Sequence, residues 1–419
     1  MAASKNALKH FKTYKYSSVD KSPISKYILR HYVQPPPSQA LTTQTNIPQW
    51  NACVEFLPLW LAPNMVTLLG FFFIIGNVAL LAVVDPDLLG PKQQWVYYSY
   101  AFGVWAYSTM DNIDGKQARR TGTSSGLGEL FDHGIDSLNC TLASLLETSA
   151  MGLGATKLGA FTALVPTLPM FFSTWETYHT HTLYLGYFNG PTEGLILASA
   201  IMITSGLYSP QIWREPLSNI IGLEEILGKM TAEDAWLPIL LAGFFVAHLP
   251  SCVYNVAQAR KANNLPLAPT FLGWIPMISF TTSLLAWLGS PYSHLLFDNH
   301  LALLCLTLSF VFGRMTTKII LAHLTRQPFP YWTGLLLPLM GGAVLVNLPV
   351  FGFEPVSAEV EHYYLWAYFA ISVVVYFRWA YLVINAICGY LNIQCLTIPE
   401  EKWKKLEEES RREAEKKKS

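Results

Sequence analysis

The chain has 419 residues, of which 52% are hydrophobic and only 13% are charged, against about 25% charged in a usual soluble domain. The mean hydropathy is +0.29 and the formal net charge is zero, so overall charge gives no reason to expect a nucleic-acid partner. These values exclude an ordinary soluble domain. The six cysteines are scattered without a CxxC pair, so neither a disulfide framework nor a structural zinc site is expected.

The first 50 residues are basic and polar, without the apolar core of a cleaved signal peptide. Residues 8–30 are expected to form a basic cytosolic arm, which the prolines at 35–37 end. The stretch 47–60 carries two tryptophans and a phenylalanine. It is expected to form a short amphipathic helix in the membrane interface, before the first span.

Apolar segments long enough to cross a bilayer recur from Val66 to Cys388. The sequence therefore predicts an all-α polytopic membrane protein with about ten transmembrane helices. These spans are expected near residues 64–84, 93–118, 125–150, 157–178, 191–208, 234–259, 268–288, 296–323, 331–350 and 362–390.

An even number of spans places both termini on one side of the membrane. Lysine and arginine gather in the loops of that side, whereas the opposite loops near 289–300 and 351–361 contain neither. The positive-inside rule then places both termini in the cytosol. The tail after Pro399 is nearly all Glu, Lys and Arg and is expected to be a solvated helix or disordered. The predicted organisation is an arm with an interfacial helix (1–60), one transmembrane domain (61–395) and a charged cytosolic tail (396–419).

Four aspartates lie inside two neighbouring predicted spans. Asp111 and Asp114 are three residues apart on one helix face, and Asp132 and Asp136 are four apart on the next helix. The turn at 121–126 makes these helices antiparallel neighbours, so the carboxylates are expected to face one another. Acidic residues at bilayer depth indicate a functional site. Hard carboxylate oxygens suit Mg²⁺, Mn²⁺ or Ca²⁺, and four of them can hold two ions that bridge a diphosphate.

Small residues beside the acids favour a bulky ligand over a simple ion pair. Gly115, Ala118 and Gly128 keep the two helix faces shallow. Arg119 offers two parallel donors to a phosphate near the cytosolic end. Asn64 follows a proline at a helix start, where it either caps the helix or contacts the ligand.

Glu129 and His133 are four residues apart on the second acidic helix. A carboxylate beside an imidazole raises its basicity and orients it, so His133 is a candidate general base that takes a proton from an attacking hydroxyl. The alternative is that the two side chains only bond each other to hide two polar groups. For the aspartates, the alternative is an ion pathway or pairing with nearby basic residues.

In chain order these residues read D-x-x-D-G-x-x-A-R-x8-G-x3-D-x3-D, with every position filled. The motif resembles the signature of the CDP-alcohol phosphotransferase family. Residues 61–67 look like the segment that opens the family's first span, and 128–137 is similar to its eukaryotic choline/ethanolamine phosphotransferase branch. Residues 175–180 and 190–194 resemble the fungal members. The resemblance covers nearly the whole chain.

The resemblance implies transfer of phosphocholine or phosphoethanolamine from CDP-choline or CDP-ethanolamine to diacylglycerol, with release of CMP. It implies two Mg²⁺ or Mn²⁺ ions on the four aspartates, a cytidine diphosphate cradle lined by Gly115, Ala118 and Gly128, a diphosphate held by Arg119, and His133 as the base with help from Glu129. It further implies a homodimer in the endoplasmic reticulum or Golgi membrane. The positive-inside rule places the mouth of the aspartate site on the cytosolic side, and no nucleic-acid partner is expected.

A choline head group needs aromatic faces, because its ammonium has no hydrogen to donate. The candidates are Trp105, Tyr107, Trp175, Tyr178 and Tyr184. Glu176 and Glu193 are expected either to attract the head group or to pair with His179 or His181.

Alternative hypotheses also account for part of the sequence. Ethanolamine is a rival main substrate. A phosphatidylinositol-type synthase, which uses CDP-diacylglycerol, is usually about half this length and lacks the Asp132-His133 pattern. A membrane prenyltransferase has its acids in two distant clusters. An ion or solute transporter predicts broken helices in two matching halves, and the sequence shows no such symmetry.

Overall fold

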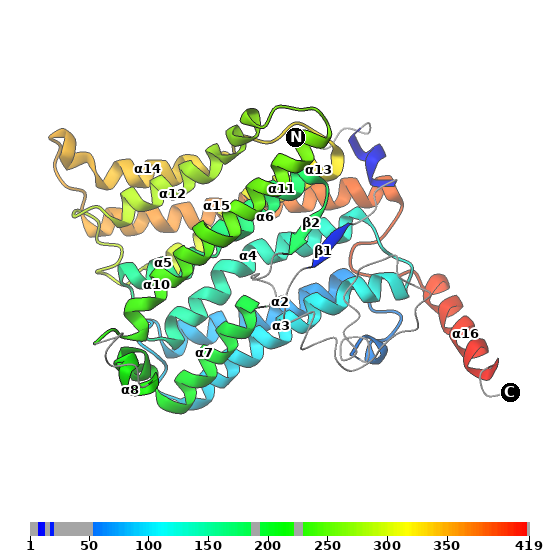
Figure 1. The fold of residues 1–419 in the computed structure, drawn as a ribbon, viewed down its shortest axis with the longest axis horizontal. Helices are drawn as coiled ribbons and strands as arrows, with labels where there is room; N and C mark the ends of the chain where they lie inside the picture. The colour runs from blue at the N-terminus through cyan, green and yellow to red at the C-terminus, as the bar shows by residue number, and fades with distance from the viewer. Residues whose placement is uncertain (1–6, 13–16, 21–52, 186–192, 222–228, 417–419) are drawn as a thin grey trace.

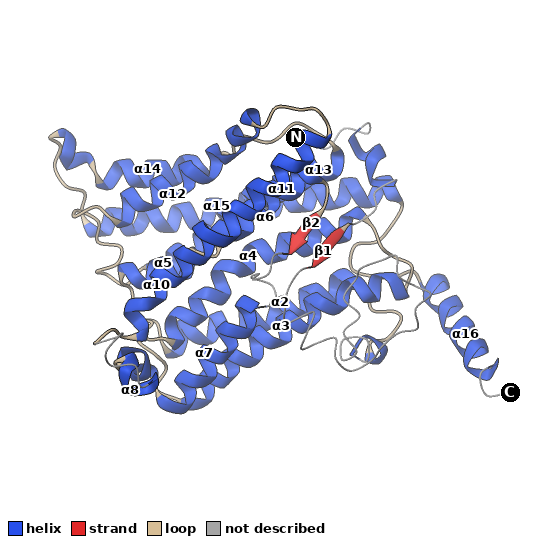
Figure 2. Ribbon diagram, in the orientation of Figure 1, coloured by secondary structure: helices blue, strands red, loops and turns tan. Residues whose placement is uncertain are grey.

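The computed structural model describes residues 7–12, 17–20, 53–185, 193–221 and 229–416. Long helices lie side by side along the longest axis of the molecule (Figures 1 and 2). Within the described ranges the sheet is a single pair of short parallel strands, β1 (Ser18–Asp20) and β2 (Leu183–Leu185). The all-α architecture is confirmed.

Ten helical segments follow the predicted spans along the chain. They are α2 (Pro63–Val84), α3 (Gln94–Arg120), α4 (Gly126–Ala150), α5 (Lys157–Leu164) with α6 (Thr167–Thr180), α7 (Leu195–Tyr208), α10 (Ala232–Ala242) with η5 (Gly243–His248) and α11 (Leu249–Ala262), η6 (Ala268–Trp274) with α12 (Ile275–Leu288), α13 (Leu301–Thr325), α14 (Leu336–Val346) and α15 (Ala358–Leu391). Short elements η1 (Ala7–Lys12), η4 (Pro210–Arg214), α8 (Leu217–Ile221) and η7 (Leu348–Phe351) and the tail helix α16 (Glu400–Lys416) complete the described chain.

Among the described residues, six segments are long and apolar enough to cross a membrane. They are α2, α5 with α6, α10 through α11, η6 with α12, α13 and α15. The apolar helices α7 and α14 are shorter, whereas α3 and α4 are long but contain the acidic residues. The chain is therefore an integral membrane protein with several spans, and the finer number of ten remains a prediction.

Two long helices form the centre of the bundle. Most residues of α4 and α13 are buried. Glycine allows them to approach closely, because a Cβ added at Gly313 of α13 would lie 2.8 Å from Leu138 Cδ2 of α4. At Gly134 of α4 the corresponding distance to Thr317 Cγ2 is 3.1 Å. Small residues at such crossings are the usual means of tight packing in membranes.

The described parts of the N-terminal arm pack onto the helices, which the prediction of a cytosolic arm did not anticipate. Leu8 and Phe11 of η1 are buried among residues of α4, α13 and α15. Strand β1 pairs in parallel with β2, in a register that places Ser18 opposite Leu183. The start of the predicted interfacial helix, 47–52, lies outside the described residues, and 53–56 form one helical turn.

Phe11 is expected to anchor this segment. Its ring fills the space above Gly126, where an added Cβ would lie 2.9 Å from Phe11 Cδ1. Phe11→Ala is expected to lower stability by about 3 kcal/mol, as for other buried phenylalanines, and to expose the segment to protease. Thermal unfolding in detergent and limited proteolysis measure both effects. Lys9→Ala, at an exposed position of the same helical turn, is the control, and equal effects of both changes would contradict the anchoring role.

Candidate active site

The acidic residues meet because α3 ends and α4 begins within a few residues. Thr121 Oγ1 donates to Gln117 O at 2.7 Å at the end of α3. Gly122 then turns the chain with φ +60°, a value that favours glycine. The Ser125 side chain accepts a hydrogen bond from Gly128 N and caps α4. This turn brings the C-terminal half of α3 alongside the start of α4.

The aspartates form one charged cluster at this junction. One ligand atom each of Asp132, His133 and Asp136 lie within 4.8 Å of one another. Asp111 and Asp114 belong to the same cluster, because the charge of Asp136 acts on both. The structure thus brings together the four aspartates that the sequence predicted.

The cluster fits a divalent cation. The buried Oδ1 atoms of Asp111 and Asp132 have no hydrogen-bond partner, although a buried polar atom normally has one. Several carboxylates close together in a low-dielectric region repel one another. Oxygen-rich sites of this kind suit Mg²⁺, Mn²⁺ or Ca²⁺, which would pair the orphaned oxygens and offset the repulsion.

Two hydroxyl groups that the sequence analysis did not assign to the site hold aspartates in place. Thr67 of α2 donates to Asp114 Oδ2, and Tyr107 of α3 donates to Asp136 Oδ1. Tyr107 was proposed instead as an aromatic face for choline. Its position four residues before Asp111, on the same face of α3, is a signal that could have pointed to this role. Nothing in the apolar segment around Thr67 indicates it.

His133 faces the carboxylates with one ring nitrogen. Its Nδ1 lies 3.5 Å from Asp136 Oδ2 and 3.9 Å from Asp132 Oδ2. Glu129 is buried and its charge acts on His133. The Oε1 atom of Glu129, however, lies 4.0 Å from His323 Nε2 of α13. Glu129 therefore has a second histidine beside it, which the sequence analysis did not identify.

His323 in turn contacts a histidine at the end of α6. Its Nδ1 lies 3.1 Å from His181 Nδ1, and the two rings are stacked with centroids 5.0 Å apart. These histidines are 142 residues apart in the chain. A spacing pattern cannot find such a pair.

Asn64 does not cap α2, so that alternative is wrong. The helix is capped at Ala62 without a side-chain bond, and Asn64 Nδ2 donates to Cys395 O at 3.0 Å. Its Oδ1 instead faces α4, 3.8 Å from where a Cβ at Gly128 would be. A ligand contact by Asn64 stays a prediction.

Two of the predicted cradle residues, Gly115 and Ala118, lie on α3 together with Arg119, whereas Gly128 lies in the first turn of α4. A Cβ added at Gly115 would be 3.6 Å from Arg119 Nη1, so the guanidinium lies beside the glycine. Arg119 is exposed and Ala118 is partly exposed. Gly115, Ala118 and Arg119 are thus next to one another near the cytosolic end predicted for α3.

The aromatic candidates for the head group have other contacts. Trp175 is fully buried, with Nε1 donating to Thr270 O, and the Tyr178 hydroxyl donates to Gln327 O. Trp105 is 60% exposed on the outside of α3, and Tyr184 lies in β2. Glu176 is buried and accepts a hydrogen bond from Asn255 Nδ2 at 2.6 Å, a partner that the sequence did not predict.

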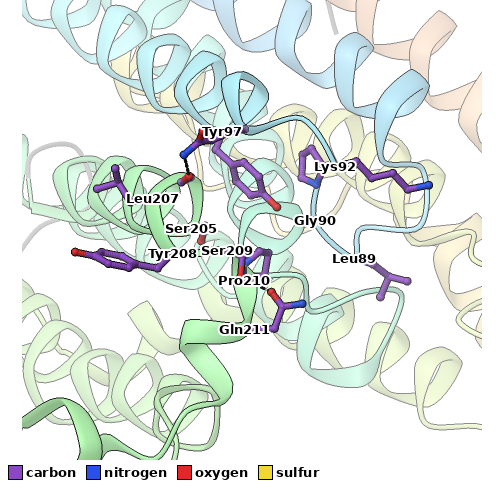
Figure 3. A pocket seen from close by; sticks show the side chains of 13 residues that line it. Leu89, Gly90, Lys92, Tyr97, Ser205, Leu207, Tyr208, Ser209, Pro210 and Gln211 are labelled. Atoms are coloured by element: carbon purple, nitrogen blue, oxygen red, sulfur yellow. Dashed lines mark hydrogen bonds between the residues drawn. The ribbon is translucent and has the colours of Figure 1, made fainter.

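A separate surface hollow of about 540 Å³ lies at the far end of α3 (Figure 3). It is lined by residues 89–92, 94, 97 and 205–211, among them Tyr97 and Pro210. Fourteen residues of helix separate Tyr97 from Asp111, roughly 21 Å along the axis. This hollow is therefore not part of the acidic site.

Known proteins are similar to this chain over the segment that contains the acidic site. A sequence profile described as CDP-alcohol phosphatidyltransferase matches residues 60–228, a range that includes all four aspartates. The chain is also 32% identical to choline/ethanolaminephosphotransferase 1 of Saccharomyces cerevisiae, over 94% of this chain and 97% of the relative. The chain belongs to the CDP-alcohol phosphatidyltransferase family.

Two further relatives are similar over most of their length. Cholinephosphotransferase 1 of Saccharomyces cerevisiae is 33% identical over 94% of this chain and 97% of its own. Ethanolaminephosphotransferase 1 of Homo sapiens is 28% identical over 81% of this chain and 82% of its own. The similarity extends well beyond the matched segment 60–228 and includes the later part of the chain.

Tyr107→Phe tests the hydroxyl that holds Asp136. Its loss removes a donor from a buried carboxylate, so we expect metal affinity or turnover to fall by about 10- to 100-fold. Titration of turnover with Mn²⁺ and Mg²⁺ measures this. Tyr100→Phe, a buried tyrosine two turns earlier on α3, is the matched control. A wild-type metal dependence in Tyr107→Phe would contradict the role.

Proposed function

We propose that the protein transfers phosphocholine or phosphoethanolamine from the corresponding CDP-alcohol to the hydroxyl of diacylglycerol, and releases CMP. The observation that carries this proposal is the cluster of four aspartates, two of which have an orphaned buried oxygen, in a polytopic membrane protein of this family. Relatives named choline/ethanolaminephosphotransferase from yeast and plants support phosphotransfer with a choline or ethanolamine head group.

The proposed cofactor is a pair of Mg²⁺ or Mn²⁺ ions. Asp111, Asp114, Asp132 and Asp136 would hold them, with Thr67 and Tyr107 fixing the orientation of two carboxylates. When bound, the ions supply positive charge that stabilises the diphosphate and the departing CMP.

The remaining cradle residues bind the donor in this proposal. Arg119 pairs with a phosphate oxygen through its guanidinium. Gly115, Ala118 and Gly128 leave room for the nucleotide. The neighbours nearest to an added Cβ are Arg119 Nη1 at 3.6 Å for Gly115 and Asn64 Oδ1 at 3.8 Å for Gly128. Asn64 contributes its Oδ1, since its Nδ2 already donates to Cys395 O.

His133 is the proposed general base, and Glu129 its supporting carboxylate. The ring places Nδ1 toward Asp132 and Asp136, so the proton on Nδ1 is held there and Nε2 keeps its lone pair. Nε2 takes the proton of the diacylglycerol hydroxyl while that oxygen bonds to the phosphorus of the donor. The bond from this phosphorus to the CMP oxygen breaks. The charge of Glu129 then stabilises the imidazolium.

The proposed location follows from the two substrates. Diacylglycerol comes from the bilayer and the nucleotide from water, so the site belongs near the cytosolic leaflet. Arg119 and Arg120, in the last turn of α3, support a cytosolic position for this end. We propose both termini in the cytosol, a membrane of the endoplasmic reticulum or Golgi, and a homodimer as the assembly.

The decisive test uses purified protein in detergent with diacylglycerol, Mg²⁺ and equal amounts of CDP-choline and CDP-ethanolamine. CMP release and the mass of the lipid product are measured together. Phosphatidylcholine, phosphatidylethanolamine or both would support the proposal and identify the head group. Absence of CMP and of both lipids, from protein that elutes as a folded species, would contradict it.

Replacing a single aspartate by asparagine tests whether the aspartates bind the metal. Asp132→Asn and Asp114→Asn are each expected to reduce turnover below detection at any Mg²⁺ or Mn²⁺ concentration, because a neutral amide is a poor ligand for a hard cation. Asp87→Asn, an exposed residue beyond the far end of α2 that contacts Asn299, is the control. Turnover like that of the wild type in either site variant would exclude the metal assignment.

Replacement of the proposed base, His133, is expected to affect kcat and nucleotide binding differently. His133→Ala is expected to lower kcat by about 10²- to 10⁴-fold while CDP-alcohol binding stays measurable by calorimetry. The kcat falls while binding is retained because, in the proposed mechanism, the ring accepts a proton but does not contact the nucleotide. Loss of nucleotide binding with an unchanged chemical step would show that His133 is a binding residue instead.

A further inference from the structure

A pair of cations lies within the apolar span α13, away from the acidic site. Phe310, Arg314 and Lys318 follow one another at intervals of four residues and share one face of the helix. This face lies against α15: the rings of Phe310 and Phe377 are 5.7 Å apart. Both cationic side chains are partly exposed. Basic residues within a membrane-spanning segment are costly and indicate a function by default.

The partners of these cations are electrically neutral. Arg314 Cζ lies 4.8 Å from the centre of the Trp379 ring, and Lys318 Nζ donates to Trp332 O at 2.6 Å. None of the ion pairs found among the described residues includes either side chain. The two positive charges also act on each other, which is unfavourable at this spacing.

Donors remain available on both groups. Arg314 Nη1 is buried and has no hydrogen-bond partner, and Lys318 uses one of its three N–H donors on Trp332. A guanidinium and an ammonium one turn apart offer the donors that the oxygens of a phosphate accept. A phosphate would therefore satisfy the orphaned nitrogen and offset the repulsion between the two charges.

The apolar surroundings of the two cations indicate that this phosphate belongs to a lipid. The apolar side chains that border the pair are exposed, with Phe377 at 56% and Trp332 at 39%, on helices or loops of a membrane-embedded bundle. We propose that Arg314 and Lys318 form a binding site for the phosphate of an anionic phospholipid, whose acyl chains lie along α13 and α15. Basic pockets between membrane helices bind such head groups.

The site is distinct from the acidic cluster but touches the same scaffold. Thr317, between the two cations in sequence, meets Gly134 of α4, one residue after His133. Arg314 and Lys318 lie on a different face of α13, toward α15 and the segment before α14. A bound lipid would thus hold the outer side of the helix whose inner side packs on α4.

Lipid titration followed by native mass spectrometry tests the proposal. Purified full-length protein in detergent is titrated separately with phosphatidylinositol, phosphatidylcholine and inorganic phosphate. We expect retention of phosphatidylinositol in preference to the other two. Arg314→Gln with Lys318→Gln should weaken this retention roughly tenfold to thirtyfold, the effect of two lost lysine or arginine charges. Inorganic phosphate that binds as tightly as the lipid would overturn the lipid assignment.

The matched control is Arg260→Gln. Arg260 lies at the end of α11, and its guanidinium also donates to a neutral partner, Pro266 O. Its loss should leave lipid retention unchanged. If the double variant does not fold, Lys318→Gln alone should show a smaller loss, and Arg314→Lys should keep most of the binding. Equal retention by wild type and the charge-removing variants, or an equal loss in Arg260→Gln, would overturn the proposal.

Discussion

Repulsion among four carboxylates at the junction of α3 and α4 is the constraint on which the site depends. Each costs free energy when buried near its neighbours, and the protein offsets part of this with hydroxyl donors. Thr67 serves Asp114 and Tyr107 serves Asp136, whereas buried Oδ1 atoms of Asp111 and Asp132 stay unpaired. The remaining oxygens suit divalent cations and their phosphate ligands. The same ions would therefore offset the repulsion between the carboxylates and bind the phosphates of the donor.

The later helices support this arrangement from behind. α13 packs on α4 through glycines and carries His323 to Glu129, so the proposed base on one helix depends on a polar contact from another. The same helix carries its cations on the face toward α15. The residues of α13 that pack on α4 and the basic pair thus lie on different faces of the helix. None of the ion pairs among the described residues joins the basic pair to the carboxylates.

Whether a feature could be predicted from the sequence depends on how far apart in the chain the contacting residues are. The four aspartates were found because their spacing is local and their helices adjoin through a short turn. Helices fell where the apolar runs predicted, since length and hydropathy are local properties. His323 beside Glu129, Cys395 beside Asn64 and β1 beside β2 were not predicted, because each joins segments more than a hundred residues apart. No periodicity in one sequence encodes such a pairing.

Both ends of the chain converge on the turn that aligns the acids. Phe11 fills the space at Gly126, and Lys402 Nζ donates to Gly122 O at 2.8 Å. The segment before α16 also forms a bridge between Thr397 and Leu61, beside the bond from Asn64 to Cys395 O. The backbone N–H groups of Thr121, Gly122 and Thr123 already bond to carbonyls of α3, and the contacts from distant segments add to these local bonds. Placement of the carboxylates within reach of shared cations thus depends on residues that the motif itself does not contain.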